Sequence, residues 1–141
     1  MPAVLALLAV CVGLVACSTA SGGPSSGTSL RIAYWEDGMG AMPPMGAKPD
    51  AAWTLRCNPA GGSLARPARA CGRLATGGRA LFAPLSPKVA CTQIYGGPQR
   101  ARVTGMLDGR PVWATFSRTN GCEIARWAKV SPWLLPPGGI T

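Results

Sequence analysis

The chain has 141 residues and a formal net charge of +9, with 14 Lys and Arg, five Asp and Glu, and no His. This length predicts one domain, and the positive balance favours contact with acidic proteins or anionic surfaces, although an ordinary solvated surface is the plainer interpretation. Without His, neither a Ser-His nor a Cys-His nucleophilic pair can form, so the sequence argues against an enzyme and offers no catalytic residue. No aromatic-interleaved RNA-binding motif accompanies the charge, so no nucleic acid partner is expected.

An apolar run opens the chain. Residues 3–16 read AVLALLAVCVGLVA, which is shorter than the roughly 20 residues of a membrane-spanning helix and has the length of a signal-peptide core. The run ends in Leu14-Val15-Ala16-Cys17, which resembles the bacterial lipobox, although no Lys or Arg precedes it. We therefore expect residues 1–17 to be a lipoprotein signal peptide with a lipid anchor on Cys17. An ordinary secretory signal cleaved nearby is the alternative.

Residues 18–28 are rich in Ser and Gly and predict a flexible linker. Residues 29–141 then form the folded domain. Either form of the leader places this domain outside the cytoplasm, held at the extracellular face of the membrane or secreted.

The cysteines beyond the leader predict disulfides. They are Cys57, Cys71, Cys91 and Cys122, and an even number of Cys in an exported domain is typical of a disulfide framework. Zinc is the competing interpretation, but no two of them have the spacing of a metal knuckle and no His assists them. We therefore expect no metal and no cofactor. Four Cys allow three pairings, and the spacing does not choose among them.

The first half of the domain predicts two strands and a helix. Residues 29–35 alternate, with Leu30, Ile32 and Tyr34 on one face, and residues 52–57 form a second strand. Helix formers occupy residues 68–76, where Cys71, Leu74 and Ala75 have helical spacing before Gly77-Gly78.

The second half predicts a hairpin and a short helix. Residues 100–107 and 111–118 flank Asp108-Gly109, a strong hairpin turn. The inward face of the second strand is either Val112, Ala114 and Phe116 or Trp113 and Thr115. Residues 124–130 form the helix, and a Pro/Gly-rich tail begins at Ser131. The fold class is α+β: an antiparallel β-sheet with one or two short helices and two disulfides.

Several short motifs stand in a fixed order along the domain: WTLRCNP at residues 53–59, ACGRL at 70–74, VACTQIY at 89–95, VTG and DGR at 103–105 and 108–110, and NGCE at 120–123. In this order and with the spacing of the four Cys, they resemble the Streptomyces subtilisin inhibitor family over residues 29–135.

The resemblance implies an inhibitor of subtilisin-like serine proteases, acting through a rigid, substrate-like loop. It implies disulfides Cys57–Cys71 and Cys91–Cys122, and a protease-sensitive bond between Gln93 and Ile94. Gln93 would enter the protease's specificity pocket. The flanking residues would be Cys91, Thr92 and Tyr95, with Asn120 near the loop. A homodimer is also implied, to which the apolar faces of the predicted hairpin would contribute.

The chain departs from the family's sequence pattern at two places, and three alternative interpretations remain open. The family usually has Pro where this chain has Thr92, and commonly Asp-Pro where it has Gly96-Gly97-Pro98. Both changes add backbone freedom beside the bond, which would weaken inhibition or make the loop cleavable. Residues 88–95 taken alone also fit a buried strand beside a disulfide. The whole domain also fits a non-inhibitory cell-envelope binding module, or a cationic module that binds anionic polymers.

Overall fold

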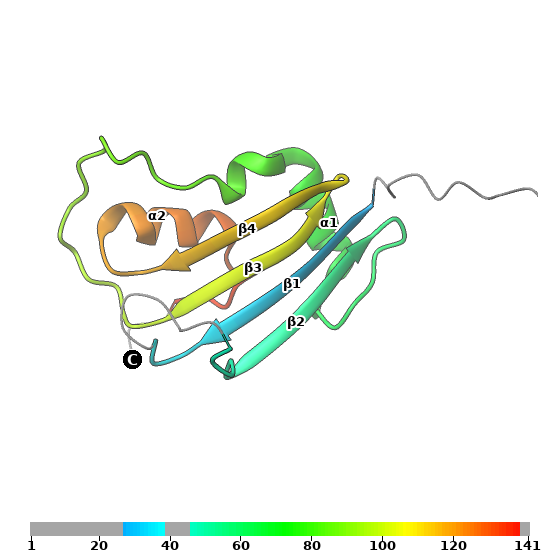
Figure 1. Ribbon diagram of the computed structural model, residues 1–141, viewed down its shortest axis with the longest axis horizontal. Helices are drawn as coiled ribbons and strands as arrows, with labels where there is room; N and C mark the ends of the chain where they lie inside the picture. Colours follow the sequence, from blue (N-terminus) through cyan, green and yellow to red (C-terminus); the bar gives the residue numbers. More distant parts are fainter. Residues whose placement is uncertain (1–26, 39–45, 139–141) are drawn as a thin grey trace, which may run out of the picture.

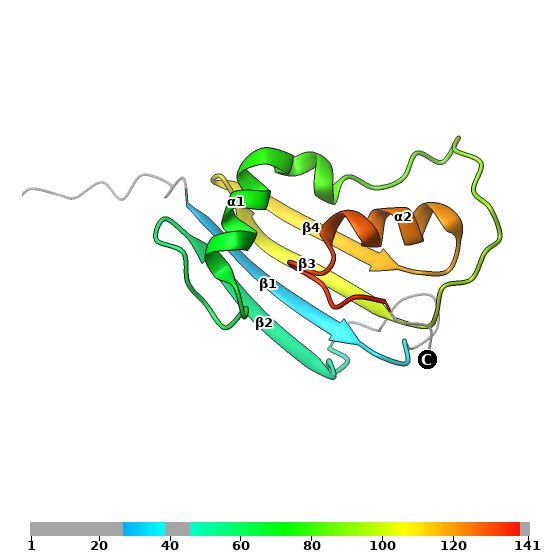
Figure 2. The same ribbon diagram turned by 180° about the vertical axis from the view of Figure 1, so that it is seen from behind.

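The computed structural model describes residues 27–38 and 46–138. Their elements are β1 (Thr28–Trp35), β2 (Ala51–Cys57), α1 (Pro67–Gly77), the 3-10 helix η1 (Gly78–Phe82), β3 (Arg100–Leu107), β4 (Arg110–Ser117) and α2 (Gly121–Val130). The strands form one antiparallel sheet of order β2-β1-β3-β4, and both α-helices lie on the same face of it (Figures 1 and 2). The predicted α+β class is confirmed. The predicted leader, with Cys17, and the linker up to residue 26 lie outside the described residues.

Alternation along the strands gives the sheet one buried face. In β4 this face carries Val112, Ala114 and Phe116, whereas Trp113 is 62% exposed, which decides between the two faces that the sequence left open. In α1, Ala70 and Leu74 are buried, one turn apart, because residues four apart share a helix face. Ala75, predicted to share that face, is exposed. The core also includes Leu30, Ile32, Tyr34, Leu55, Ala101, Val103, Leu107, Trp127 and Val130.

Helix α2 starts at Gly121, three residues before the predicted start at Ile124. The reason is Asn120, whose side-chain oxygen Oδ1 accepts a 3.0 Å hydrogen bond from the N–H of Glu123. Such a cap satisfies a backbone donor that the first turn of a helix otherwise leaves without a partner.

The segment after α2 belongs to the core. Trp133, Leu134 and Leu135 are 7%, 2% and 1% exposed. The sequence predicts only a Pro/Gly-rich tail in this region, and its packing into the core was not predicted.

The two ends of strand β1 contact opposite ends of the β3–β4 hairpin. At its first residue, the hydroxyl of Thr28 accepts a 3.2 Å hydrogen bond from the N–H of Asp108, in the turn between β3 and β4. Asp108 and Gly109 have φ of 50° and 74°, as the predicted two-residue hairpin turn requires. At its other end, Trp35 pairs with Arg100, the first residue of β3.

The helix-free face of the sheet carries polar and aromatic side chains. The guanidinium of Arg102 lies 5.6 Å from the ring of Trp35 and 5.1 Å from that of Trp113. Met106 on the same strand is 38% exposed. None of the helices within residues 27–38 and 46–138 is long and apolar enough to cross a membrane.

Candidate functional site

A long loop links η1 to β3. Residues 83–99 contain no helix or strand. Connections longer than about 12–15 residues without regular structure are uncommon in compact domains, and they are usually either functional loops or linkers. The loop passes the start of α2 before it enters β3 (Figure 1). The alternative interpretation of residues 88–95 as a buried strand is wrong, because this segment is irregular and largely exposed.

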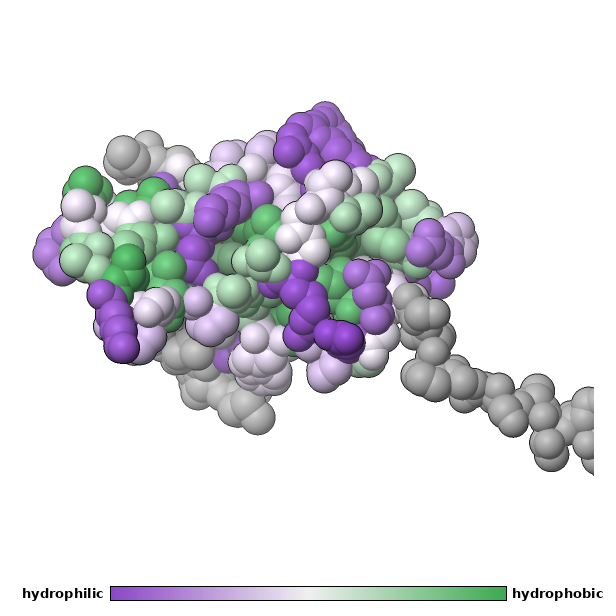
Figure 3. Space-filling view, turned by 90° about the horizontal axis from the view of Figure 1, so that it is seen from above, coloured by the Kyte–Doolittle hydropathy of each residue, from purple (hydrophilic) through white to green (hydrophobic). Residues whose placement is uncertain are grey.

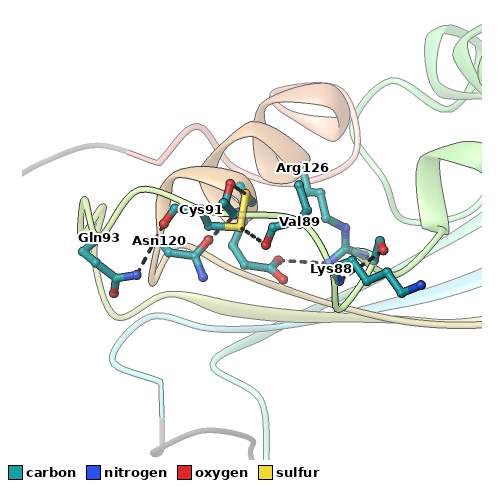
Figure 4. The surroundings of a disulfide bond; sticks show 10 residues. Lys88, Val89, Cys91, Gln93, Asn120 and Arg126 are labelled. Carbon is teal, nitrogen blue, oxygen red and sulfur yellow. Dashed lines mark hydrogen bonds and ion pairs between the residues drawn. A yellow bond between two sulfur atoms is a disulfide. The ribbon is translucent and has the colours of Figure 1, made fainter.

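Two disulfides fix the loop and the opposite end of the domain. Cys57–Cys71 joins β2 to α1, and Cys91–Cys122 joins the loop to the first turn of α2 (Figure 4). This is the pairing that the family resemblance implies. The four sulfurs are bonded in two pairs, so none of these four cysteines has a free thiolate that could bind zinc. In the part of the chain that the structure describes, no group of three or more His, Cys, Asp or Glu could hold a metal ion.

Two main-chain hydrogen bonds hold the loop on either side of Gln93–Ile94. The carbonyl oxygen of Thr92 accepts a 3.0 Å hydrogen bond from the N–H of Gly121, and the N–H of Gly96 donates a 2.7 Å hydrogen bond to the carbonyl oxygen of Arg118. The intervening side chains are exposed, with Ile94 63% accessible. The candidate bond therefore lies between two attachment points, one at Gly121, the first residue of α2, and one at Arg118, just after β4.

The start of α2 contacts the loop so closely that a side chain there would collide with it. A Cβ atom built on Gly121 would lie 2.0 Å from the hydroxyl oxygen of Thr92. Gly121 is therefore part of the site, although the sequence analysis did not single it out. Its place between Asn120 and Cys122, both of which the resemblance assigned to the site, was the available signal.

The glycines after Tyr95 fit a specific backbone conformation. A Cβ atom on Gly96 would lie 2.9 Å from the Cδ1 atom of Ile124, and Gly97 has a φ of +132°, which side-chain-bearing residues rarely adopt. The N–H of Gly96 is also hydrogen-bonded. Glycine is intrinsically flexible. In this structure, however, Gly96-Gly97, which departs from the family pattern, has a defined conformation with a hydrogen bond and close neighbours.

Gln93 follows Thr92 in the loop, and Asn120 precedes Gly121 at the start of α2, so the two residues adjoin the Thr92–Gly121 hydrogen bond along the chain. Figure 4 shows Gln93 at the tip of the loop, where its side-chain Nε2 donates a 3.4 Å hydrogen bond to the carbonyl oxygen of Cys91. Asn120 directly precedes Gly121, whose N–H is hydrogen-bonded to the loop, and its side-chain oxygen caps α2. Asn120 thereby fixes the helix turn that presents the N–H of Gly121 to Thr92.

The exposed tip of the loop is uncharged and partly apolar. Residues 91–96 read CTQIYG, with no Asp, Glu, Lys, Arg or His. Tyr95, like Ile94, is 63% exposed. In Figure 3 the end of the molecule that carries the loop shows hydrophobic residues at the surface between hydrophilic ones. This arrangement can offer exposed main chain and apolar side chains to a partner protein.

Comparisons with known proteins agree with this geometry. The model of the subtilisin inhibitor-like family matches residues 38–120. Streptomyces caespitosus sermetstatin, solved in complex with Bacillus licheniformis subtilisin, is 25% identical with a TM-score of 0.52, and the match covers 77% of this chain and 97% of sermetstatin. No curated protein matches the sequence. Because the family model covers more than half of its length, the chain belongs to the subtilisin inhibitor-like family.

Proposed function

We propose that the chain inhibits subtilisin-type serine proteases by presenting Gln93–Ile94 as a substrate-like bond. The observation that carries the proposal is the double attachment of the loop. Main-chain hydrogen bonds at Thr92 and Gly96 enclose three exposed residues, and the Cys91–Cys122 disulfide adds a covalent link one residue before Thr92. The structural similarity to sermetstatin, whose structure contains subtilisin, supports this choice of partner.

Rigidity explains why such a loop would inhibit. Proteases bind extended main chain together with a side chain in a pocket, and a flexible peptide loses conformational freedom when it binds. A loop already held in shape loses less, so its affinity is higher. After cleavage, the attached segments would keep the new amine of Ile94 beside the acyl-enzyme, where rejoining competes with hydrolysis. The inhibitor itself needs no catalytic residue, and we propose that it has no enzymatic activity.

Titration of subtilisin with the purified chain tests the proposal. Residual activity should fall linearly to near zero at equimolar inhibitor, while Gln93–Ile94 is cut slowly. Gln93→Asp should weaken inhibition because it places a carboxylate in the protease pocket. Thr76→Asp is the matched control, since it adds the same charge to exposed α1. Rapid cleavage without inhibition, or equal effects of the two variants, would reject the proposed site.

We propose that the domain is held at the extracellular face of the membrane through a lipid on Cys17. The lipobox-like sequence and the Ser/Gly-rich segment after it support this. Intact-mass spectrometry of the native protein should show an acylated Cys17 at the amino terminus. A mature chain that starts elsewhere, without lipid, would support free secretion instead.

We also propose a homodimer formed by the helix-free face of the sheet. Trp113 and Met106 are exposed there, and exposed aromatic residues are enriched at protein interfaces. Small-angle scattering of the purified chain should give twice the monomer mass, and Trp113→Lys should reduce it to the monomer. A monomer mass for the natural chain at all accessible concentrations would contradict the dimer.

A further inference from the structure

Arg118, a buried arginine between β4 and α2, lies beneath the loop. It is 7% exposed. Its Nη1 donates a 3.1 Å hydrogen bond to the side-chain oxygen of Gln99, and its Nη2 donates a 3.1 Å hydrogen bond to the carbonyl oxygen of Gly138. Its own carbonyl oxygen accepts the 2.7 Å hydrogen bond from Gly96. One residue thus connects Gly96 in the loop, Gln99 at the end of the loop just before β3, and the segment after α2.

Gln99 extends this connection to β1. It is 8% exposed, and its Nε2 donates a 3.4 Å hydrogen bond to Glu36 Oε1, while the hydroxyl of Tyr34 donates a 2.5 Å hydrogen bond to Glu36 Oε2. The guanidinium of Arg118 is therefore connected to the carboxylate of Glu36 through the side-chain amide of Gln99. A buried polar group needs hydrogen-bonding partners of this kind, because burying it without one lowers the stability of the fold. The connected side chains restrict one another's positions.

The pair Gln99 and Arg118 also supports Gly97. A Cβ atom on Gly97 would lie 2.2 Å from the side-chain oxygen of Gln99 and 3.2 Å from Nη1 of Arg118. Gly97 therefore rests directly on the hydrogen-bonded pair, and Gly96 beside it is bonded to the main chain of Arg118. Both glycines of the loop are fixed by the same buried group.

We propose that Arg118, with Gln99, is a positioning residue that fixes the leaving-group side of the reactive bond. The inference rests on the proposed function. When the protease serine attacks the Gln93 carbonyl carbon, the bond to the Ile94 nitrogen breaks, the nitrogen takes a proton and an acyl-enzyme forms. Rejoining requires that amine to lose its proton and attack the acyl carbon, which releases the serine. Residues 96–98 hold the amine in reach only while Arg118 and Gln99 hold them.

Hydrogen exchange tests the positioning without any protease. We expect Arg118→Met and Gln99→Leu to accelerate amide exchange at Gly96 by about tenfold or more, while exchange at Gly121 stays within about twofold. Arg126→Met is the matched control, because Arg126 is also a largely buried arginine but bonds to Glu123 and the carbonyl oxygen of Thr115. An exchange rate at Gly96 that rises no more in Arg118→Met than in Arg126→Met would overturn the inference.

Gly138→Ala keeps the inference falsifiable if the other variants fail to fold. The added Cβ atom would lie 2.1 Å from the Cζ atom of Arg118, so the guanidinium must move although both Arg118 and Gln99 are retained. Faster exchange at Gly96 is the expected result. Unchanged exchange at Gly96 would count against the positioning role.

Incubation with subtilisin connects the positioning to inhibition. The Arg118 and Gln99 variants should be hydrolysed at Gln93–Ile94 about tenfold faster than the natural chain once bound, with little change in the association rate. Arg126→Met should lose stability without this change in the hydrolysis rate. If the natural chain does not inhibit, the proposed function fails, yet exchange at Gly96 still decides whether Arg118 fixes the loop. Equal hydrolysis rates for Arg118→Met and Arg126→Met would reject the role in inhibition.

Discussion

The N–H of Gly121 donates a 3.0 Å hydrogen bond to the carbonyl oxygen of Thr92, and their chain neighbours Cys122 and Cys91 form a disulfide. Two adjacent residues of the loop are thus attached to two adjacent residues at the start of α2. A single attachment would leave the loop free to rotate about it. Two in succession fix the direction in which the chain continues towards Gln93.

Replacing Gln93 with Lys should convert the chain into a trypsin inhibitor. A trypsin-type pocket contains a buried carboxylate, which Gln leaves without a cationic partner at a cost of several kcal/mol. Lys supplies the cation, so affinity for trypsin should rise by orders of magnitude, at about 1.4 kcal/mol for each factor of ten. Subtilisin inhibition should change much less. Unchanged trypsin inhibition by a folded Gln93→Lys variant would show that Gln93 does not enter the pocket.

Removal of each disulfide should separate stability from resistance to cleavage. The Cys91–Cys122 and Cys57–Cys71 bonds span 31 and 14 positions, and each should contribute about 3–4 kcal/mol to the free energy of unfolding. Replacement of either pair by Ala should lower that free energy in urea denaturation. Only the loss of Cys91–Cys122 should accelerate cleavage at Gln93–Ile94 by subtilisin. Equal acceleration in both variants would argue that global stability alone controls cleavage.

Gly121→Ala should displace the loop, and a second substitution should restore it. The new Cβ atom would collide with the Thr92 hydroxyl oxygen but would lie 3.4 Å from the Thr92 Cβ atom. We expect about 1–3 kcal/mol of destabilisation from the overpacked contact, together with weaker subtilisin inhibition. Thr92→Ala removes the colliding oxygen, so the double variant should recover most of both. A double variant as weak as Gly121→Ala would show that another contact is responsible.

Asn120→Ala should destabilise α2 by about 1 kcal/mol, because Ala cannot cap the helix. Asn120→Asp is the control, since a carboxylate oxygen can accept the same hydrogen bond from Glu123. The midpoint temperature of thermal unfolding and the strength of subtilisin inhibition should both fall in the Ala variant. Both should stay near the natural values in the Asp variant. If inhibition falls equally in both variants, the amide of Asn120 acts on the loop directly.

Stability should decline at alkaline pH through Tyr34. Burial, reinforced by the hydrogen bond to Glu36, raises the pKa of Tyr34 well above its ordinary value of 10.0. The unfolded chain therefore loses this proton first, so the free energy of unfolding is unaffected below the unfolded pKa and falls as the pH rises above it. Urea midpoints of the natural chain should drop as the pH rises above about 10 more than those of Tyr34→Phe. Parallel declines would exclude Tyr34 as the cause.

Patterns confined to a few neighbouring residues predicted most of the fold. Alternation identified β1 and the β3–β4 hairpin, and Asp108-Gly109 identified the turn, because strand faces and tight turns depend on local geometry. Position in the chain was a poorer guide to burial. Leu134 and Leu135 lie between Pro132 and the Pro/Gly run at residues 136–139, yet tertiary packing places them in the core.

The site was predicted through family resemblance more than through local pattern. The apolar run around Ile94 fits a buried strand equally well, since period alone does not distinguish a strand from an irregular exposed segment. Arg118 and Gln99 could not be predicted from the sequence, because isolated Arg and Gln residues are mostly exposed. They become buried only where β3, the loop and the segment after α2 converge.

The direction of β1 has a consequence for how the domain meets other proteins. The strand begins at Thr28 beside the hairpin turn and ends at Trp35 beside the first residue of β3, which directly follows the loop. Its eight residues extend over about 25 Å. The chain thus enters the domain at one pole and displays Gln93–Ile94 at the other (Figure 1). If the proposed lipid on Cys17 attaches the domain by its amino-terminal side, the loop would lie at the end of the domain farthest from the attachment point, where proteases arriving from the medium could reach it.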